Sequence, residues 1–221
     1  MLVYERMTHH PITVHPDMPI TDALNLMREQ KVRRFPVIHR TTKKLMGIVT
    51  EKALLYASPS PATSLSMHEI HYLLAKLTVD KVMSTDLVTV TEDTPIEEAA
   101  RIMVDRSVGA LPVMRGDALV GIITETDLFK TFIELFAARQ EGVRLTLLVP
   151  EKKGELLAIT QAIAGLGGDI ISLGTFQGED TTNRLLTIKV GEVPQEDLVR
   201  KMQDIGARVV DVRTCQDYET C

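Results

Sequence analysis

Apolar residues recur at helical spacing in two segments of the first half of the chain. The first set is Ile20, Ala23, Leu24 and Met27, and the second set is Ile96, Ala99, Ala100 and Met103. Both sets follow the i, i+3, i+4, i+7 spacing that places side chains on one face of a helix. The second set is introduced by Thr94-Pro95-Ile96-Glu97, the pattern of a capping box with proline at the first helical position. We therefore expect an amphipathic helix in each segment.

Two short apolar runs follow each expected helix. They cover residues 35–38 and 45–49 in the first segment, and residues 111–114 and 119–123 in the second. Turn-forming residues separate the runs of each pair, which is typical of a β-hairpin. A further helix is expected to begin at Thr50 and at Thr124. Both segments therefore read as strand, helix, strand, strand, helix.

The two segments are copies of one another. Aligning Met7 with Met83 and allowing a two-residue deletion gives roughly 17 identities in under 50 positions. The aligned pairs include Pro36-Val37 with Pro112-Val113, and Thr50-Glu51 with Thr124-Glu125. This agreement exceeds what apolar segments share by chance, so the segments are an internal duplication, named copy 1 and copy 2 below.

Residues 143–214 show no trace of the repeat. We expect strands at 143–149, 169–176, 184–190 and 207–212, and helices over 156–163 and around Leu198, Met202 and Ile205. The order βαββαβ fits a ferredoxin-like α+β fold.

Composition narrows the class of protein. The 221 residues are 44% hydrophobic and carry a formal net charge of -5, which argues against nucleic acid or an anionic membrane as partner. No apolar run approaches the roughly 20 residues of a membrane-spanning helix, and the N-terminus lacks a signal-peptide pattern. Two cysteines, Cys215 and Cys221, are too few for a disulfide framework or a four-ligand zinc site. We expect a cytoplasmic protein with no metal site, no catalytic cofactor and no catalytic residues.

The hairpin motifs resemble the cystathionine-β-synthase (CBS) domain. They are Pro36-Val37 followed by Gly47-Ile48-Val49-Thr50, and Leu111-Pro112-Val113 followed by Gly121-Ile122-Ile123-Thr124-Glu125-Thr126-Asp127. The resemblance implies two βαββα CBS motifs, at residues 1–60 and 81–138, packed as one Bateman module. A linker helix is expected between them at 61–80.

Residues 143–214 resemble an ACT domain, a regulatory module often attached to enzymes of amino-acid metabolism. The resemblance implies an effector site at Gly154, Glu155, Leu156, Asp169 and Ile170. Lys152-Lys153 replaces the acidic residue and proline usual in that loop, which leaves amino-acid binding open. Two CBS motifs followed by one ACT domain are similar in layout to the AcuB family, associated with acetoin utilisation.

Thr124 and Asp127 carry the clearest candidate chemistry. A helix that begins at Thr124 offers free N–H groups and a dipole that favour an anion, and Asp127 lies over its first turn. A carboxylate there can accept hydrogen bonds from both hydroxyls of a ribose. The CBS resemblance assigns Asp127 to the ribose and Thr124 to the phosphate side. The alternative is a plain N-cap with an acidic residue in the first turn.

The resemblance also assigns the base-binding residues. They are Thr85, Asp86, Leu87, Val88, Val108, Ala110, Leu111 and Pro112, each of which also suits an ordinary core or turn position. For the phosphates, residues 28–44 carry seven cations with Glu29 as the only acid. Within this run Arg33 and Arg34 precede a strand and are the candidates, because the planar guanidinium binds phosphate with two parallel hydrogen bonds. The alternative is that both belong to a solvated helix end and hairpin.

Copy 1 has Ala53 where copy 2 has Asp127. A methyl group cannot hold a diol, so we expect one competent site per chain. The sequence thus favours a regulatory protein that senses AMP, ADP, ATP or S-adenosylmethionine, with the ACT domain as an effector site or dimer contact. The alternative is an assembly scaffold with vestigial sites. We expect a homodimer, with an unidentified target protein as a further partner.

Overall fold

The structure, a computed structural model, describes residues 1–57 and 77–215 and divides into two compact units, residues 1–128 and residues 129 onward. Most of the linker helix expected at 61–80 lies outside the described residues, as does Cys221. No helix within the described ranges is long and apolar enough to cross a membrane.

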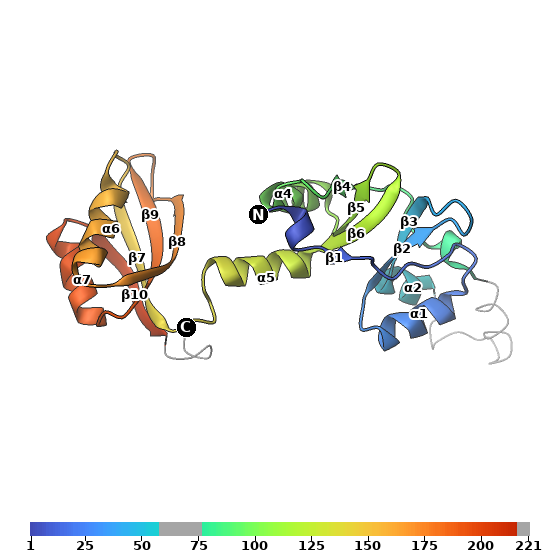
Figure 1. Ribbon diagram of the computed structural model, residues 1–221, viewed down its shortest axis with the longest axis horizontal. Helices are drawn as coiled ribbons and strands as arrows, with labels where there is room; N and C mark the ends of the chain where they lie inside the picture. The colour runs from blue at the N-terminus through green and yellow to red at the C-terminus, as the bar shows by residue number, and fades with distance from the viewer. Residues whose placement is uncertain (58–76, 216–221) are drawn as a thin grey trace. The chain divides into compact units, whose positions relative to one another are not determined.

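The elements of the first unit, in chain order (Figure 1), are η1 Val3–Glu5, β1 Thr8–His9, α1 Ile20–Glu29, β2 Arg34–Ile38, β3 Leu45–Thr50, α2 Glu51–Ala57, η2 Val79–Lys81, β4 Val90–Thr91, α4 Ile96–Arg106, β5 Ala110–Arg115, β6 Ala118–Thr124 and the start of α5 Glu125–Leu135. The second unit holds the rest of α5 and then β7 Gly142–Pro150, α6 Glu155–Gly165, β8 Asp169–Gln177, β9 Asn183–Gly191, α7 Gln195–Asp204 and β10 Arg208–Cys215.

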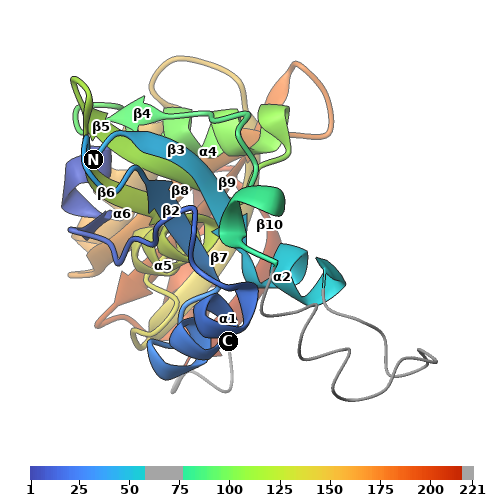
Figure 2. The same ribbon diagram turned by 90° about the vertical axis from the view of Figure 1, so that its right-hand side faces the viewer.

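The two copies fold alike. In copy 1, β2 and β3 form an antiparallel hairpin, and α1 and α2 pack against each other beside it (Figure 2). In copy 2, β5 and β6 form the matching hairpin. A parallel bridge joins Val14 to Val37, and its counterpart joins Val90 to Val113. The mixed α+β fold with two repeated units is therefore confirmed.

Each copy contributes its first residues to the other. The strand β1 pairs with β6 of copy 2, and Val3 and Met7 are buried in the core of copy 2. Reciprocally, Ser84 pairs with Ile48 of β3, and Val79 is buried in the core of copy 1. The chain thus crosses from one copy to the other after β1 and again after Ser84, which ties the copies into one unit.

A glycine in each hairpin makes room for the exchanged segment. A Cβ on Gly47 would lie 2.7 Å from Sδ of Met83 and 2.8 Å from the carbonyl oxygen of Ser84. In copy 2, a Cβ on Gly121 would meet Sδ of Met7 in the same way. A larger residue at Gly47 would meet the backbone of the exchanged segment, and one at Gly121 would displace the Met7 side chain.

The start of α4 differs from the prediction. Pro95 is the N-cap residue rather than the first helical residue, and it makes no capping hydrogen bond from its side chain. The Thr94 hydroxyl instead accepts a hydrogen bond from the N–H of Thr91 at 3.1 Å. The predicted capping box is therefore wrong, because Thr94 belongs to the turn after β4. Pro19 is the N-cap of α1 in the same extended conformation.

The second unit is a four-stranded antiparallel sheet in the order β10-β7-β9-β8, with α6 and α7 on one face (Figure 1). The apolar face of the sheet meets both helices in one core, in which Leu145, Ile159, Ile188 and Leu198 are fully buried. This arrangement is the ferredoxin-like fold predicted for residues 143–214. Cys215, at the end of β10, is buried.

The segment that follows α5 packs on β8 and β9 within the second unit. Phe136 stacks on Phe176 with ring centroids 5.8 Å apart, and a Cβ on Gly174 would lie 2.6 Å from the Phe136 ring. Lys189 is only 2% exposed, and its Nζ donates a hydrogen bond to the carbonyl oxygen of Ala137 at 3.0 Å. Residues ahead of this four-stranded sheet are therefore part of its packing.

Candidate functional site

The carboxylate of Asp127 is oriented by Thr124. Thr124 ends β6, Asp127 lies in the first turn of α5, and both side chains are half-buried. Oδ2 of Asp127 accepts hydrogen bonds from the backbone N–H of Thr124 at 3.0 Å and from its hydroxyl at 2.7 Å. Both Thr124 donors that the resemblance assigns to a phosphate thus contact Asp127. A phosphate would reach them only by replacing one of these bonds.

Copy 1 supplies a cation to the start of α5. Arg34 begins β2, and its Nη2 lies 3.5 Å from Oε2 of Glu125, the first residue of α5. The side chain of Arg34 is 23% exposed, against 55% for Glu125. A Cβ on Gly109 would lie 2.6 Å from Oε2 of Glu125 and would also meet Nη2 of Arg34. Gly109 therefore provides the space in which this pair lies.

The residues around Asp127 form the candidate site. Ala110 pairs with Thr124 across the β5–β6 hairpin, and the N–H of Glu125 donates to the carbonyl oxygen of Gly109 at 3.2 Å. The structure thus places Gly109 against the Arg34–Glu125 pair, and Asp127 is joined to the same helix start through Thr124. The residues of this cluster are Arg34, Gly109, Ala110, Thr124, Glu125 and Asp127.

The equivalent place in copy 1 is built from different residues. The N–H of Glu51 donates to the carbonyl oxygen of Arg33 at 2.9 Å, which matches the bond from Glu125 to Gly109. Arg33 therefore stands where copy 2 has glycine. The N–H of Ala53 donates to the Thr50 hydroxyl at 3.2 Å, so the helix cap is kept without a carboxylate. This half of the duplication retains the structural cap and has no carboxylate at the position of Asp127.

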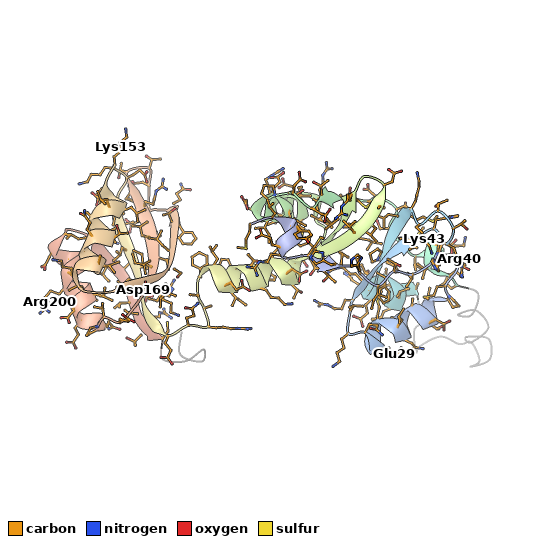
Figure 3. The ribbon with its side chains drawn as sticks, in the orientation of Figure 1. Glu29, Arg40, Lys43, Lys153, Asp169 and Arg200 are labelled. Carbon is orange, nitrogen blue, oxygen red and sulfur yellow. The ribbon has the colours of Figure 1, made fainter. Side chains whose placement is uncertain are left out.

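The cations of residues 28–44 do not form one patch. Figure 3 shows Glu29 at the end of α1, far from Arg40 and Lys43 at the β2–β3 turn. Arg40 contacts both carboxylate oxygens of Asp17, at 3.1 and 2.9 Å, and Lys44 pairs with Asp117 at 3.0 Å. Arg33 is exposed. The cations of this run are therefore dispersed, and Arg34 contacts Glu125 at the start of α5.

The base-binding candidates lie in different environments. Leu111 and Pro112 are buried in β5, with Leu111 fully inside the core of copy 2. Val88 and Val108 pack against the same core, whereas Thr85 and Asp86 are exposed. Leu87 lines a cavity of about 750 Å³ that also includes Thr89, Glu98, Met114 and Asp117. The lining of that cavity contains none of the residues around Asp127.

Gly109 and Glu125 were not among the predicted site residues. A signal for Gly109 is present in the internal alignment, which sets it against Arg33 and Ala110 against Arg34. Positions where two copies of one unit differ most in size and charge are places where the two sites can differ in function. Glu125 gives no such signal, because Glu51 matches it.

The candidate effector residues of the second unit do not come together. Gly154, with a φ of +93°, is the N-cap of α6, and Glu155 pairs with Lys152 at 2.8 Å. Leu156 is 44% exposed. Asp169 begins β8 after the 11-residue helix α6, about 16 Å further along its axis, and Ile170 packs against the core. Figure 3 shows Lys153 and Asp169 at opposite ends of the unit, so one chain does not assemble this site.

Within the described residues, no group of three or more His, Cys, Asp or Glu side chains is placed to hold a metal ion. The ionisable groups with shifted pKa values lie elsewhere. Arg115 lowers the pKa of Glu92 by hydrogen bonding, and Arg101 does the same to the pKa of Glu98. Both pairs lie around β4 and α4 and stabilise the surface of copy 2. The candidate site is therefore defined by geometry and charge.

Comparison with known families agrees with this architecture. The CBS domain family matches residues 3–60 and 79–134, and the TTHA0829-like ACT domain family matches residues 141–213. The chain belongs to the CBS domain family and carries a C-terminal ACT domain. It is similar to a putative acetoin utilization protein (AcuB) from Vibrio cholerae, at 33% identity over 62% of this chain and 93% of that chain, with a TM-score of 0.51.

Other relatives share the CBS pair. The uncharacterized protein MJ1225 of Methanocaldococcus jannaschii is 29% identical over 128 residues, or 56% of this chain. The chain spans 46% of the length of that relative. A structure of CBSX2 in complex with AMP is 28% identical over 60% of this chain and 96% of that chain, with a TM-score of 0.48.

Proposed function

We propose that the chain is a regulatory protein that binds one adenosyl ligand, an adenine nucleotide or S-adenosylmethionine, at the cluster around Asp127. The observation that carries the proposal is the carboxylate of Asp127, held by two hydrogen bonds from Thr124 in the same helix start that Arg34 of the other copy contacts through Glu125. A carboxylate fixed in this way can accept hydrogen bonds from a ribose diol. A guanidinium nearby can bind a phosphate.

Binding has a route to the rest of the protein in this proposal. The cluster contains residues of both copies, and each copy holds the first residues of the other. A ligand that contacts both copies would favour one arrangement of the pair over others, in proportion to its difference in affinity for them. In this proposal the chain regulates an unidentified target protein rather than catalysing a reaction.

We also propose a homodimer. Helices of the described chain expose large apolar side chains, among them Tyr56 of α2 at 79% and Phe129 of α5 at 68%. The edge strand β8 offers a second surface, because an unpaired strand edge readily pairs with another chain. Sedimentation equilibrium is expected to give twice the mass of one chain, and a mass of one chain contradicts this part of the proposal.

The test of ligand binding is a calorimetric titration with AMP, ADP, ATP and S-adenosylmethionine. We expect one of them to bind at about one per chain, and Asp127→Ala to abolish that binding. The matched control is Asp22→Ala, which removes an exposed carboxylate from the first turn of α1 and should leave binding unchanged. If none of the four ligands binds, the alternative of an assembly scaffold is favoured, and an effector would then be sought at the ACT domain.

A further inference from the structure

Arg34 and Glu125 join the two copies through a single long contact. Their closest atoms, Nη2 and Oε2, are 3.5 Å apart, and the glutamate is more than half exposed. An ion pair with this geometry and exposure is weak in water. A guanidinium can bind a phosphate through two short parallel hydrogen bonds, against the single long contact that Arg34 makes with Glu125. Glu125 is therefore a partner that a phosphate can displace.

The pair lies at the start of α5, the helix whose first turn carries Asp127. Glu125 follows Thr124 directly and lies two residues before Asp127, in the same first turn of α5. Its N–H donates to Gly109, and the absence of a Cβ on Gly109 leaves room for both Arg34 and the Glu125 carboxylate. The CBS resemblance assigns Thr124 to the phosphate side, and Glu125 follows Thr124 directly. A phosphate held at Thr124 would therefore approach Glu125 and its partner Arg34.

We propose that Glu125 is a built-in competitor for the phosphate of the ligand, and that the Arg34–Glu125 pair makes the site selective for adenosine 5′-phosphates over uncharged or cationic adenosyl compounds. The inference rests on the proposed function and names the ligand class of the same site. An anionic 5′ group takes Arg34 from Glu125. An uncharged 5′ group leaves the pair intact and gains nothing from Arg34.

Copy 1 provides an internal control for this charge switch. Glu51 occupies the position equivalent to Glu125, at the start of α2. The residue equivalent to Arg34 is Ala110 in copy 2, which has no charge to offer. Removing the charge of Glu51 therefore changes the net charge of the protein as much as removing that of Glu125, without freeing a cation at a ligand site.

The experiment compares AMP with adenosine, which differ only by the phosphate. Calorimetric affinities are measured at low salt for the unmodified protein, Glu125→Gln, Arg34→Gln, the double variant and Glu51→Gln. We expect Glu125→Gln to tighten AMP binding about threefold to tenfold and to leave adenosine binding unchanged. Arg34→Gln is expected to weaken AMP binding about tenfold or more, again without an effect on adenosine. Glu51→Gln should change neither affinity.

The double variant tests whether the two residues act as a pair. If Glu125 acts by occupying Arg34, most of the gain from Glu125→Gln disappears in the Arg34→Gln background. Equal effects of Glu125→Gln on AMP and adenosine, or no effect on either, overturn the inference while leaving the proposed ligand site in place. No binding of either compound by any of the five proteins overturns both proposals.

Discussion

Asp127 accepts two hydrogen bonds from Thr124, one from its backbone N–H and one from its hydroxyl, at 3.0 and 2.7 Å. This carboxylate therefore stabilises the start of α5 as well as being placed for a ligand. In copy 1 the structural half of this arrangement is kept by Thr50, whose hydroxyl accepts from the N–H of Ala53. The duplication thus separates helix capping, which both copies need, from the ligand chemistry proposed for copy 2.

Replacement of Asp127 should lower stability as well as ligand binding. Asp127→Ala leaves the N–H of Thr124 without its carboxylate acceptor, and we expect a loss of about 1 kcal/mol in the free energy of unfolding. Asp127→Asn keeps an acceptor oxygen and should cost less than half as much, while still weakening ligand binding. Urea denaturation of both variants measures this difference. Equal stability losses would show that the carbonyl oxygen of Asn does not replace the cap.

Two changes should give copy 1 a ligand site. Ala53→Asp restores the carboxylate, but Arg33 still stands where copy 2 has Gly109. We therefore expect Ala53→Asp alone to leave the stoichiometry of the adenosyl ligand near one per chain. The double variant Arg33→Gly/Ala53→Asp should add a second, weaker site, because Ala110 supplies no cation there. Calorimetric stoichiometry distinguishes the two, and a second site from Ala53→Asp alone would contradict the role given to Arg33.

The two hairpin glycines should respond differently to alanine. A Cβ at Gly47 meets the backbone oxygen of Ser84 at 2.8 Å as well as Met83, and a backbone atom cannot move aside. At Gly121 the three nearest atoms all belong to the side chain of Met7, which can take another rotamer. We expect Gly47→Ala to cost about 2 kcal/mol of unfolding free energy and Gly121→Ala less than about 1 kcal/mol. Thermal or urea unfolding of the pair tests this order, and the reverse order would contradict the packing described for Ser84.

Lys189 should make stability depend on pH at the alkaline end. Burial lowers the pKa of Lys189 from its ordinary value of 10.5, with a further contribution from the nearby Arg144 cation. Below the folded-state pKa the lysine is charged in both states, and the cost of burying the charge is fully present. Between that pKa and 10.5, the folded protein has lost a proton that the unfolded chain still holds. In this pH range the contribution of Lys189 to the free energy of unfolding therefore rises with pH.

The measurement is the free energy of unfolding of the unmodified protein and of Lys189→Met at pH 8 and pH 10. The free energy of unfolding of the unmodified protein should increase relative to that of Lys189→Met between pH 8 and pH 10. The exposed Lys153 serves as control, since Lys153→Met should leave the pH dependence as it is. A difference that stays constant for Lys189→Met would show that the lysine is not buried as a charge.

The sequence predicted local structure well because the local signals are strong. The spacing of Ile20 and Met27 predicted α1, and the apolar runs around Pro36 and Pro112 predicted both hairpins. The order βαββαβ of the second unit was also predicted from periodicity and glycines. The pairing of β1 with copy 2 was not predicted. Its two residues, Thr8 and His9, are too few to show a periodic pattern from which a partner strand could be inferred.

The candidate site was predicted only in part, because a contact between residues distant in the sequence leaves no local pattern. Thr124 and Asp127 lie within one helical turn, so their spacing revealed their contact. Arg34 and Glu125 are separated by 91 positions, and only the packing of the two copies brings them together. The run of cations at 28–44 was misleading, because Asp17 and Asp117, distant in sequence, pair with two of its members.

The account rests most directly on the number of ligand sites and their dependence on one carboxylate. The decisive measurement is a calorimetric titration of AMP into the full chain and into Asp127→Ala under the same conditions. Binding at about one AMP per chain that is lost in the variant is the predicted result. Binding at two per chain, or binding that persists without Asp127, would contradict the assignment of the site to copy 2.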